Sequence, residues 1–169
     1  AQRLVRLHQA VQVGGRHLAL PMERYPDLTL GDANDAFISV GTDLAERAIR
    51  DALAASGLEP RDVDVIFTTT VTGIATPSID ARLINRLGFR SDIKRIPMFG
   101  LGCVAGAAGT ARLADYLRGH PDQVGVLLSV ELCSLTLQRG DFSVANLIAS
   151  GLFGDGAAAL VGLGENRAR

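Results

Sequence analysis

A chain of 169 residues with 47% hydrophobic and 21% charged residues can bury a core as a single domain, and this composition excludes a disordered protein. The formal net charge of −1, with Lys and Arg residues scattered along the chain, gives no sign of a nucleic-acid-binding surface. No apolar run approaches the roughly 18 residues that a membrane-spanning helix needs, so we expect no membrane partner.

The two cysteines, Cys103 and Cys133, indicate a reducing compartment. They stand in a Gly- and Ala-rich chain without a secretory leader, which fits the cytoplasm. They could pair, but the sequence does not require a disulfide. We therefore expect a cytoplasmic protein.

The first third of the chain predicts two helices separated by an irregular stretch. Residues 1–11 place their apolar side chains on one helical face, and a Gly-Gly pair ends that helix. Residues 16–20 form a candidate short strand that a proline stops, and residues 21–33 are typical of a loop. A long helix over 32–55 follows, with an apolar stripe and a Ser-Gly pair at its end.

The middle of the chain alternates strands with a helix. Residues 63–69 form a short β-branched run that predicts a buried strand. The loop 70–77 follows it, and ligands of open α/β sheets gather at the carboxyl ends of strands. We expect a helix over 78–87, which ends at a glycine, and a strand over 93–99.

A glycine-flanked cysteine turn follows this strand, in the segment FGLGCVAGAAG of residues 99–109. If a helix begins at or just after Cys103, its unpaired N–H groups and its dipole favour a thiolate there. A free cysteine is also among the most buried residue types, so a small buried hydrophobe is the other interpretation. The sequence of the turn alone does not decide between these two interpretations of Cys103.

The last third completes a layered α/β pattern. The inward side of the helix over 103–117 consists of Ala and Gly, which permits close packing. We expect strands over 124–132 and 157–163, with a polar loop and a short helix over 145–152 between them. This alternation predicts an α/β fold with a largely parallel sheet. A buried helix at Cys103 would need layers on both sides, and one sheet accounts for only half of that burial.

Four ordered segments resemble the N-terminal half of type III polyketide synthases, the chalcone-synthase-like enzymes of the thiolase superfamily. They are the cysteine turn and the segments TTTVTGIATPS, ELCSLTLQRG and GLFGDGAAAL. The resemblance runs from about Arg3 to Gly164, and it implies a five-layered α-β-α-β-α fold of two similar halves. This chain then supplies the N-terminal α-β-α half as residues 1–164, followed by a polar tail over 165–169.

The resemblance implies a decarboxylative condensing enzyme whose nucleophile is Cys103. Phe153 matches the aromatic gatekeeper between the CoA tunnel and the reaction cavity. Three further positions match residues that line the cavity, namely Thr72, Cys133 and Thr136. A cysteine at position 133, where plant enzymes usually carry threonine, resembles the bacterial branch and favours a pocket wall over a disulfide partner.

The resemblance also implies the partners of the protein. The loop residues Thr76 and Pro77 match the segment that reaches across a homodimer interface, although plant enzymes usually carry methionine at position 76. Arg3 and Arg6 match two basic residues that hold the CoA phosphates, whereas a third such position is Ala10. The implied substrates are an acyl-CoA starter and malonyl-CoA, with no cofactor and no metal.

The family's catalytic histidine and asparagine belong to its C-terminal half, which this chain lacks. None of the three histidines, His8, His17 and His120, has the family context, and Asn146 lies outside the asparagine motif. We expect the chain alone to be inactive and, without its missing half or a dimer partner, poorly soluble. Two alternatives are an enzyme of the ketoacyl-ACP synthase III kind, which shares the cysteine turn, and a non-catalytic half domain that only dimerises.

Overall fold

The computed structural model describes residues 2–138 and 140–168, apart from the side chains of residues 2 and 3. In these residues one four-stranded sheet has the strand order β2-β1-β3-β4. The neighbours of β1 are parallel to it, whereas β4 runs antiparallel to β3. The strands are β1 (Val65–Thr70), β2 (Lys94–Phe99), β3 (Val124–Leu132) and β4 (Asp155–Leu163).

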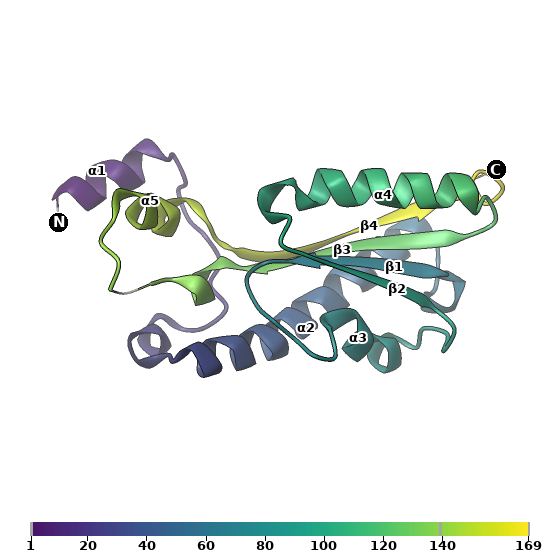
Figure 1. The fold of residues 1–169 in the computed structure, drawn as a ribbon, viewed down its shortest axis with the longest axis horizontal. Helices are drawn as coiled ribbons and strands as arrows, with labels where there is room; N and C mark the ends of the chain where they lie inside the picture. Colours follow the sequence, from purple (N-terminus) through teal and green to yellow (C-terminus); the bar gives the residue numbers. More distant parts are fainter. Residues whose placement is uncertain (1, 139, 169) are drawn as a thin grey trace.

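Helices cover both faces of the sheet (Figure 1). The α-helices are α1 (Gln2–Ala10), α2 (Leu30–Ser56), α3 (Ile79–Leu87), α4 (Ala105–Gly119) and α5 (Val144–Leu152). Short 3₁₀ turns are η1 (Met22–Asp27), η2 (Pro60–Asp62), η3 (Gly102–Val104) and η4 (Cys133–Thr136). The predicted α/β fold with a largely parallel sheet is therefore confirmed. None of the helices in the described part of the chain is long and apolar enough to cross a membrane.

The predicted strand over 16–20 is wrong. This segment belongs to no sheet, and it is held instead by single contacts with the start of β4. The His17 carbonyl accepts the Asp155 N–H at 3.1 Å, and the Ala19 N–H donates to the Asp155 carboxylate. An apolar alternation predicts an extended backbone, but it does not show whether a neighbouring strand is available to pair with it.

The long helix α2 and α3 build the larger core on one face of the sheet. α2 begins with a capping box between Thr29 and Asp32 and ends at Gly57, whose φ of 67° is the left-handed conformation that glycine adopts readily. Its buried side chains include Phe37 and Ile49, which belong to the same core cluster as Val126. This face supplies most of the buried apolar contacts.

The opposite face carries α4, which approaches the sheet closely. Two strand glycines make room for its leucines: a Cβ at Gly125 would lie 2.4 Å from Leu113, and one at Gly162 would lie 2.8 Å from Leu117. A Cβ at Gly109 of α4 would lie 2.7 Å from a β3 leucine. The other side of α4 is largely exposed in the described chain. Of the two layers expected around this helix, only the layer formed by the sheet is therefore present.

The N-terminal segment packs at one end of the sheet, where α1 lies beside α5 (Figure 1). His8 connects the two helices, because its Nε2 lies 3.2 Å from the Leu147 carbonyl and 3.2 Å from the Ser150 hydroxyl. At the opposite end of the molecule, Asn166 donates to Asp122 at 2.8 Å and so fixes the polar tail against the turn after α4.

Candidate active site

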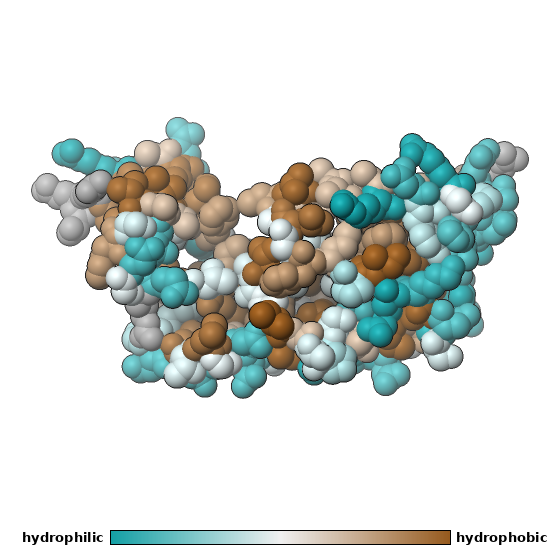
Figure 2. All heavy atoms as spheres, viewed as in Figure 1, coloured by the Kyte–Doolittle hydropathy of each residue, from teal (hydrophilic) through white to brown (hydrophobic). Residues whose placement is uncertain are grey.

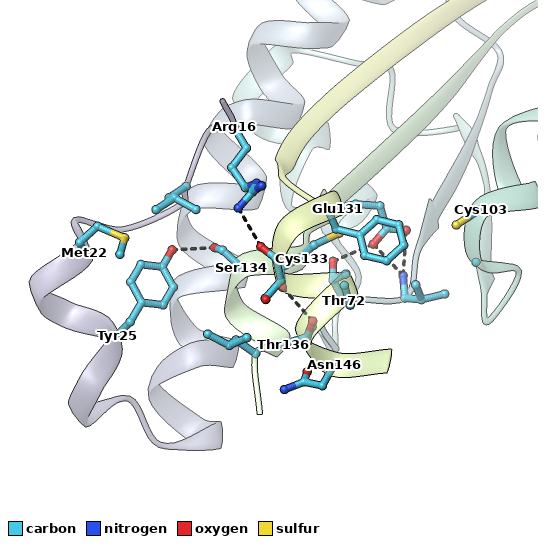
Figure 3. Close-up of a pocket in the computed structure, with 17 residues that line it drawn as sticks. Arg16, Met22, Tyr25, Thr72, Cys103, Glu131, Cys133, Ser134, Thr136 and Asn146 are labelled. Atoms are coloured by element: carbon cyan, nitrogen blue, oxygen red, sulfur yellow. Dashed lines mark hydrogen bonds between the residues drawn. The ribbon is translucent and has the colours of Figure 1, made fainter. Parts of the chain in front are cut away.

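A cleft of about 630 Å³ opens at the carboxyl ends of β1 and β3 (Figure 3). Its walls come from the loop after β1, the turn before α4, the end of β3 with η4, one side of α5 with the residue that follows it, and the N-terminal arm. This is the edge at which open α/β sheets bind their ligands. The cleft brings together five of the predicted site residues, namely Thr72, Cys103, Cys133, Thr136 and Phe153.

Two left-handed glycines present Cys103 to the cleft. Gly100 has a φ of 86° and Gly102 a φ of 57°, which residues with a Cβ rarely adopt. The backbone can therefore turn sharply out of β2 and into η3, and α4 begins two residues after the cysteine. Cys103 is a free and exposed cysteine. The structure thus favours an accessible thiol at the start of a helix over a buried hydrophobe.

The loop after β1 is seated on α2 through Gly73. A Cβ at Gly73 would lie 2.1 Å from the ring of Phe37, which is buried. The side chain of Asn34 holds the next residue at both ends: its Nδ2 donates to the Ile74 carbonyl and its Oδ1 accepts the Ile74 N–H, each at 2.8 Å. These contacts fix the position of Thr72 in the cleft wall.

Glu131, which the sequence did not single out, orients Thr72. Its carboxylate accepts the Thr72 hydroxyl at 2.7 Å and the Val71 N–H at 3.1 Å, and the Thr72 oxygen accepts the Leu132 N–H at 2.8 Å. The carboxylate therefore connects the ends of the two parallel strands β1 and β3. Its place as the only charged residue in the mostly apolar strand over 124–132 was the signal that could have identified it.

Cys133 follows directly after β3 and is half-buried. Burial raises the pKa of its thiol, and the negative charges of Glu131 and Asp155 raise it further. The Thr136 hydroxyl donates to the Cys133 carbonyl at 2.8 Å and so closes the η4 turn. Both cysteines are free, and Figure 3 shows Cys103 well apart from Cys133. A disulfide between them is absent from this structure.

Arg16 anchors the end of α5 that precedes Phe153. Its Nη1 donates to the Ser150 carbonyl at 2.7 Å and its Nη2 donates to the Gly151 carbonyl, and these acceptors lie in the last turn of the helix. The Nε atom is buried without a hydrogen-bond partner among the described residues. A Cβ at Gly154 would lie 2.9 Å from the Cβ of Arg16. The arginine is therefore packed against the backbone on both sides of Phe153.

The structure leaves other predicted residues outside the cleft. Thr76 and Pro77 are exposed in the loop after β1 and are not part of the described cleft lining. Arg6 is exposed on α1, and the side chain of Arg3 lies outside the described residues. Among the described side chains, those of Thr76, Pro77 and Arg6 do not line the cleft.

His8, His120 and Asn146 have side-chain partners within the fold. His120 stacks on Tyr116 with a ring-centroid distance of 4.1 Å, and its Nδ1 lies 2.8 Å from the Tyr116 carbonyl. Asn146 lines the cleft, but its side-chain amide donates to the carbonyls of Gln138 and Asp141. These contacts give His120 and Asn146 partners within the fold, whereas His17 is exposed.

Comparison with known proteins assigns the family. Residues 28–169 match the model of the family described as FAE1/type III polyketide synthase-like protein. The chain therefore belongs to this family.

Individual relatives support the same assignment. The chain is 59% identical over 167 residues to a 1,3,6,8-tetrahydroxynaphthalene synthase of Streptomyces peucetius subsp. caesius, a match that covers 98% of this chain and 44% of the relative. It is 34% identical to the enzyme of that name from Streptomyces griseus, over 96% of this chain and 44% of the relative.

A crystal structure extends the likeness to the fold. 1,3,6,8-Tetrahydroxynaphthalene synthase from Streptomyces coelicolor A3(2), a bacterial type III polyketide synthase, superimposes with a TM-score of 0.92 at 35% identity. The match covers 96% of this chain and 47% of that one. The chain thus spans about half the length of the relatives that it matches, and the predicted thiolase-like half fold is confirmed.

Proposed function

We propose that this chain is the N-terminal half of a type III polyketide synthase that carries its substrate as a thioester on Cys103. The observation that carries this proposal is the exposed Cys103 thiol on the wall of a cleft whose lining is mainly apolar. An attacking thiol and a cavity that can hold an acyl chain are what acyl transfer requires.

The reaction begins with loading. The Cys103 thiolate attacks the carbonyl carbon of an acyl-CoA starter, the carbon–sulfur bond to CoA breaks, and CoA leaves with a proton. Malonyl-CoA then loses CO₂ to give an enolate, whose carbon attacks the Cys103 thioester. Cys103 leaves as the thiolate, and the product is a β-ketoacyl-CoA that is two carbons longer. No cofactor is needed, since the CoA thioesters are substrates.

The other residues shape this cavity and admit the substrates. Thr72, Cys133 and Thr136 form its walls, while Phe153 stands at the end of α5, where a gatekeeper would separate the CoA entrance from the cavity. Arg3 and Arg6 hold the CoA phosphates from α1. The enolate and the thiolate also need stabilising donors, and a histidine and an asparagine of the C-terminal half supply them.

The proposed assembly is a homodimer in which the loop of Thr76 and Pro77 reaches the partner. These residues are exposed and free to do so. The free thiols of Cys103 and Cys133 suit a reducing compartment such as the cytoplasm.

The test uses the complete protein, with this chain joined to the half that completes its relatives. It is incubated with malonyl-CoA and a panel of acyl-CoA starters, and the products are identified by mass spectrometry. 1,3,6,8-Tetrahydroxynaphthalene is the first product to look for, because relatives carry that name. We expect Cys103→Ala to abolish both the acyl-enzyme mass and the product while the fold is retained. Undiminished product from Cys103→Ala would contradict the proposal.

A further inference from the structure

A second hollow lies directly behind one wall of the cleft. It has a volume of about 450 Å³, and it shares Tyr25, Ser134 and Leu137 with the cleft lining. A single layer of side chains therefore separates the two spaces. Figure 3 shows Tyr25 on the side of the cleft opposite Cys103, with Cys133 and Thr136 between them. Tyr25 thus stands, with Met22, at the end of the cavity away from the sulfur of Cys103.

The lining of the second hollow suits a hydrocarbon chain. Most of the side chains that the cleft does not share are aliphatic, namely Leu28, Leu30, Ala33 and Leu135. Among the described residues, no charged side chain lines this space. The aliphatic part of this lining can take up an apolar chain, because the gain comes from the apolar surface that is removed from water, and Thr29 and Gln138 are the polar members that the cleft does not share.

A relay of hydrogen bonds fixes Tyr25 in the separating layer. The Leu20 N–H donates to the Tyr25 hydroxyl at 3.2 Å, and that hydroxyl lies 2.6 Å from the Ser134 Oγ. The Ser134 hydroxyl in turn donates to the Asp155 carboxylate, which also accepts the Ser134 N–H at 2.8 Å. The Ser134 proton is committed to Asp155, so Tyr25 is the donor to Ser134. This series of hydrogen bonds begins at the Leu20 backbone N–H and ends at the Asp155 carboxylate, and it keeps the Tyr25 ring in place.

We propose that Tyr25, held by Ser134, is the end wall that limits the length of the acyl chain on Cys103. The second hollow is the space into which a longer aliphatic chain extends once that wall is removed. This inference rests on the proposed function, since it takes the group on Cys103 to be an acyl thioester.

The experiment measures acyl loading by chain length. The complete protein is mixed with butanoyl-CoA or dodecanoyl-CoA, and the rate of acyl-enzyme formation at Cys103 is followed by intact mass. In Tyr25→Ala we expect the dodecanoyl-to-butanoyl rate ratio to rise about tenfold or more, because pockets discriminate methylene groups by at least that factor. Tyr25→Phe keeps the ring but loses the hydrogen bond to Ser134, so it is expected to raise the ratio less than Tyr25→Ala does.

Two further variants distinguish the opening of the second hollow from a general enlargement of the cleft. Met22 lies in the same η1 turn and lines the cleft but not the second hollow, so Met22→Ala should leave the ratio unchanged. Adding Leu28→Phe to Tyr25→Ala refills the hollow and should return the ratio toward the wild-type value. If Tyr25→Ala fails to fold, Tyr25→Leu also removes the ring and the hydroxyl and is interpreted in the same way.

The outcomes separate this inference from the proposed function. Absence of loading by either thioester in the wild type contradicts the proposed function itself. Normal butanoyl loading with an unchanged ratio in folded Tyr25→Ala and Tyr25→Leu overturns the end wall alone. An equal rise of the ratio in Met22→Ala also overturns it, because the effect would then not depend on opening the second hollow.

Discussion

At the scale of single residues, the two cysteines of the cleft differ in their surroundings. Cys103 is exposed, whereas burial and the charges of Glu131 and Asp155 raise the pKa of Cys133. Only the thiolate reacts with iodoacetamide, and a raised pKa keeps a thiol protonated to higher pH. We therefore expect Cys103 to be alkylated far faster near neutral pH, with Cys133 labelled only as the pH rises. Peptide mapping of the complete protein at successive pH values measures both rates.

Glu131→Gln tests the cause of this difference. Glutamine keeps an oxygen that can accept from Thr72 but removes a negative charge near Cys133, so the labelling curve of Cys133 should move to lower pH. Asp35→Asn removes an exposed charge of α2 outside the cleft lining and serves as the control. Equal labelling of the two cysteines at neutral pH, or an unmoved curve in Glu131→Gln, would count against the argument.

The residues that sequence reasoning missed act through long-range contacts. Cys103 and Phe153 stand in segments with a recognisable order, so their motifs could be identified. Arg16 is different, because its partners in α5 lie 134 and 135 positions away in the chain. Ser134 meets Tyr25 across 109 positions. Local spacing carries no information on such pairs, and only the folded chain brings them together.

At the scale of elements, the contact between the N-terminal arm and α5 positions Phe153. Arg16→Ala removes two hydrogen bonds from a charged donor to the last turn of α5, and we expect a loss of about 2 kcal/mol in the free energy of unfolding. The end of α5 should also become looser, so KM for the acyl-CoA starter should rise more than kcat falls. Urea unfolding and steady-state kinetics of the complete protein measure these effects.

Two comparisons make the Arg16 prediction specific. Arg16→Lys keeps the positive charge but lacks the planar guanidinium that donates to both carbonyls. Its free energy of unfolding should therefore lie between those of Arg16→Ala and the wild type. Arg24 is an exposed arginine of η1, and Arg24→Ala should leave KM unchanged. A KM that stays at the wild-type value in folded Arg16→Ala would show that the arm does not position the entrance.

The bounds of the elements could be predicted where local patterns are strong. The strand over 124–132 was predicted at the bounds observed for β3, because this short and mostly apolar segment is rich in Val and Leu and is bounded by polar residues. The segment 16–20 has a similar short apolar pattern, yet it pairs with no strand. Whether a partner edge is free depends on the whole sheet, which the local sequence does not contain.

At the scale of the whole molecule, apolar surface remains uncovered. Figure 2 shows apolar atoms gathered near the middle of one face. Phe99 and Val104, which flank the cysteine turn, are 63% and 58% exposed, and Ile74 in the loop after β1 is 67% exposed. Such side chains around a cleft are typical of a surface that another element covers. The relatives, about twice as long, have a further half that can do so.

We therefore expect a polypeptide of residues 1–169 alone to bind the dye ANS and to self-associate, because ANS reports exposed apolar surface. It should also form no polyketide, since the proposed histidine and asparagine are absent from it. The complete protein at equal molar concentration should bind clearly less dye, and it serves as the matched control in both assays. A monomeric 1–169 polypeptide without ANS fluorescence would show that this surface needs no cover. Polyketide formation by that polypeptide would show that the chain contains all of the groups that the reaction requires.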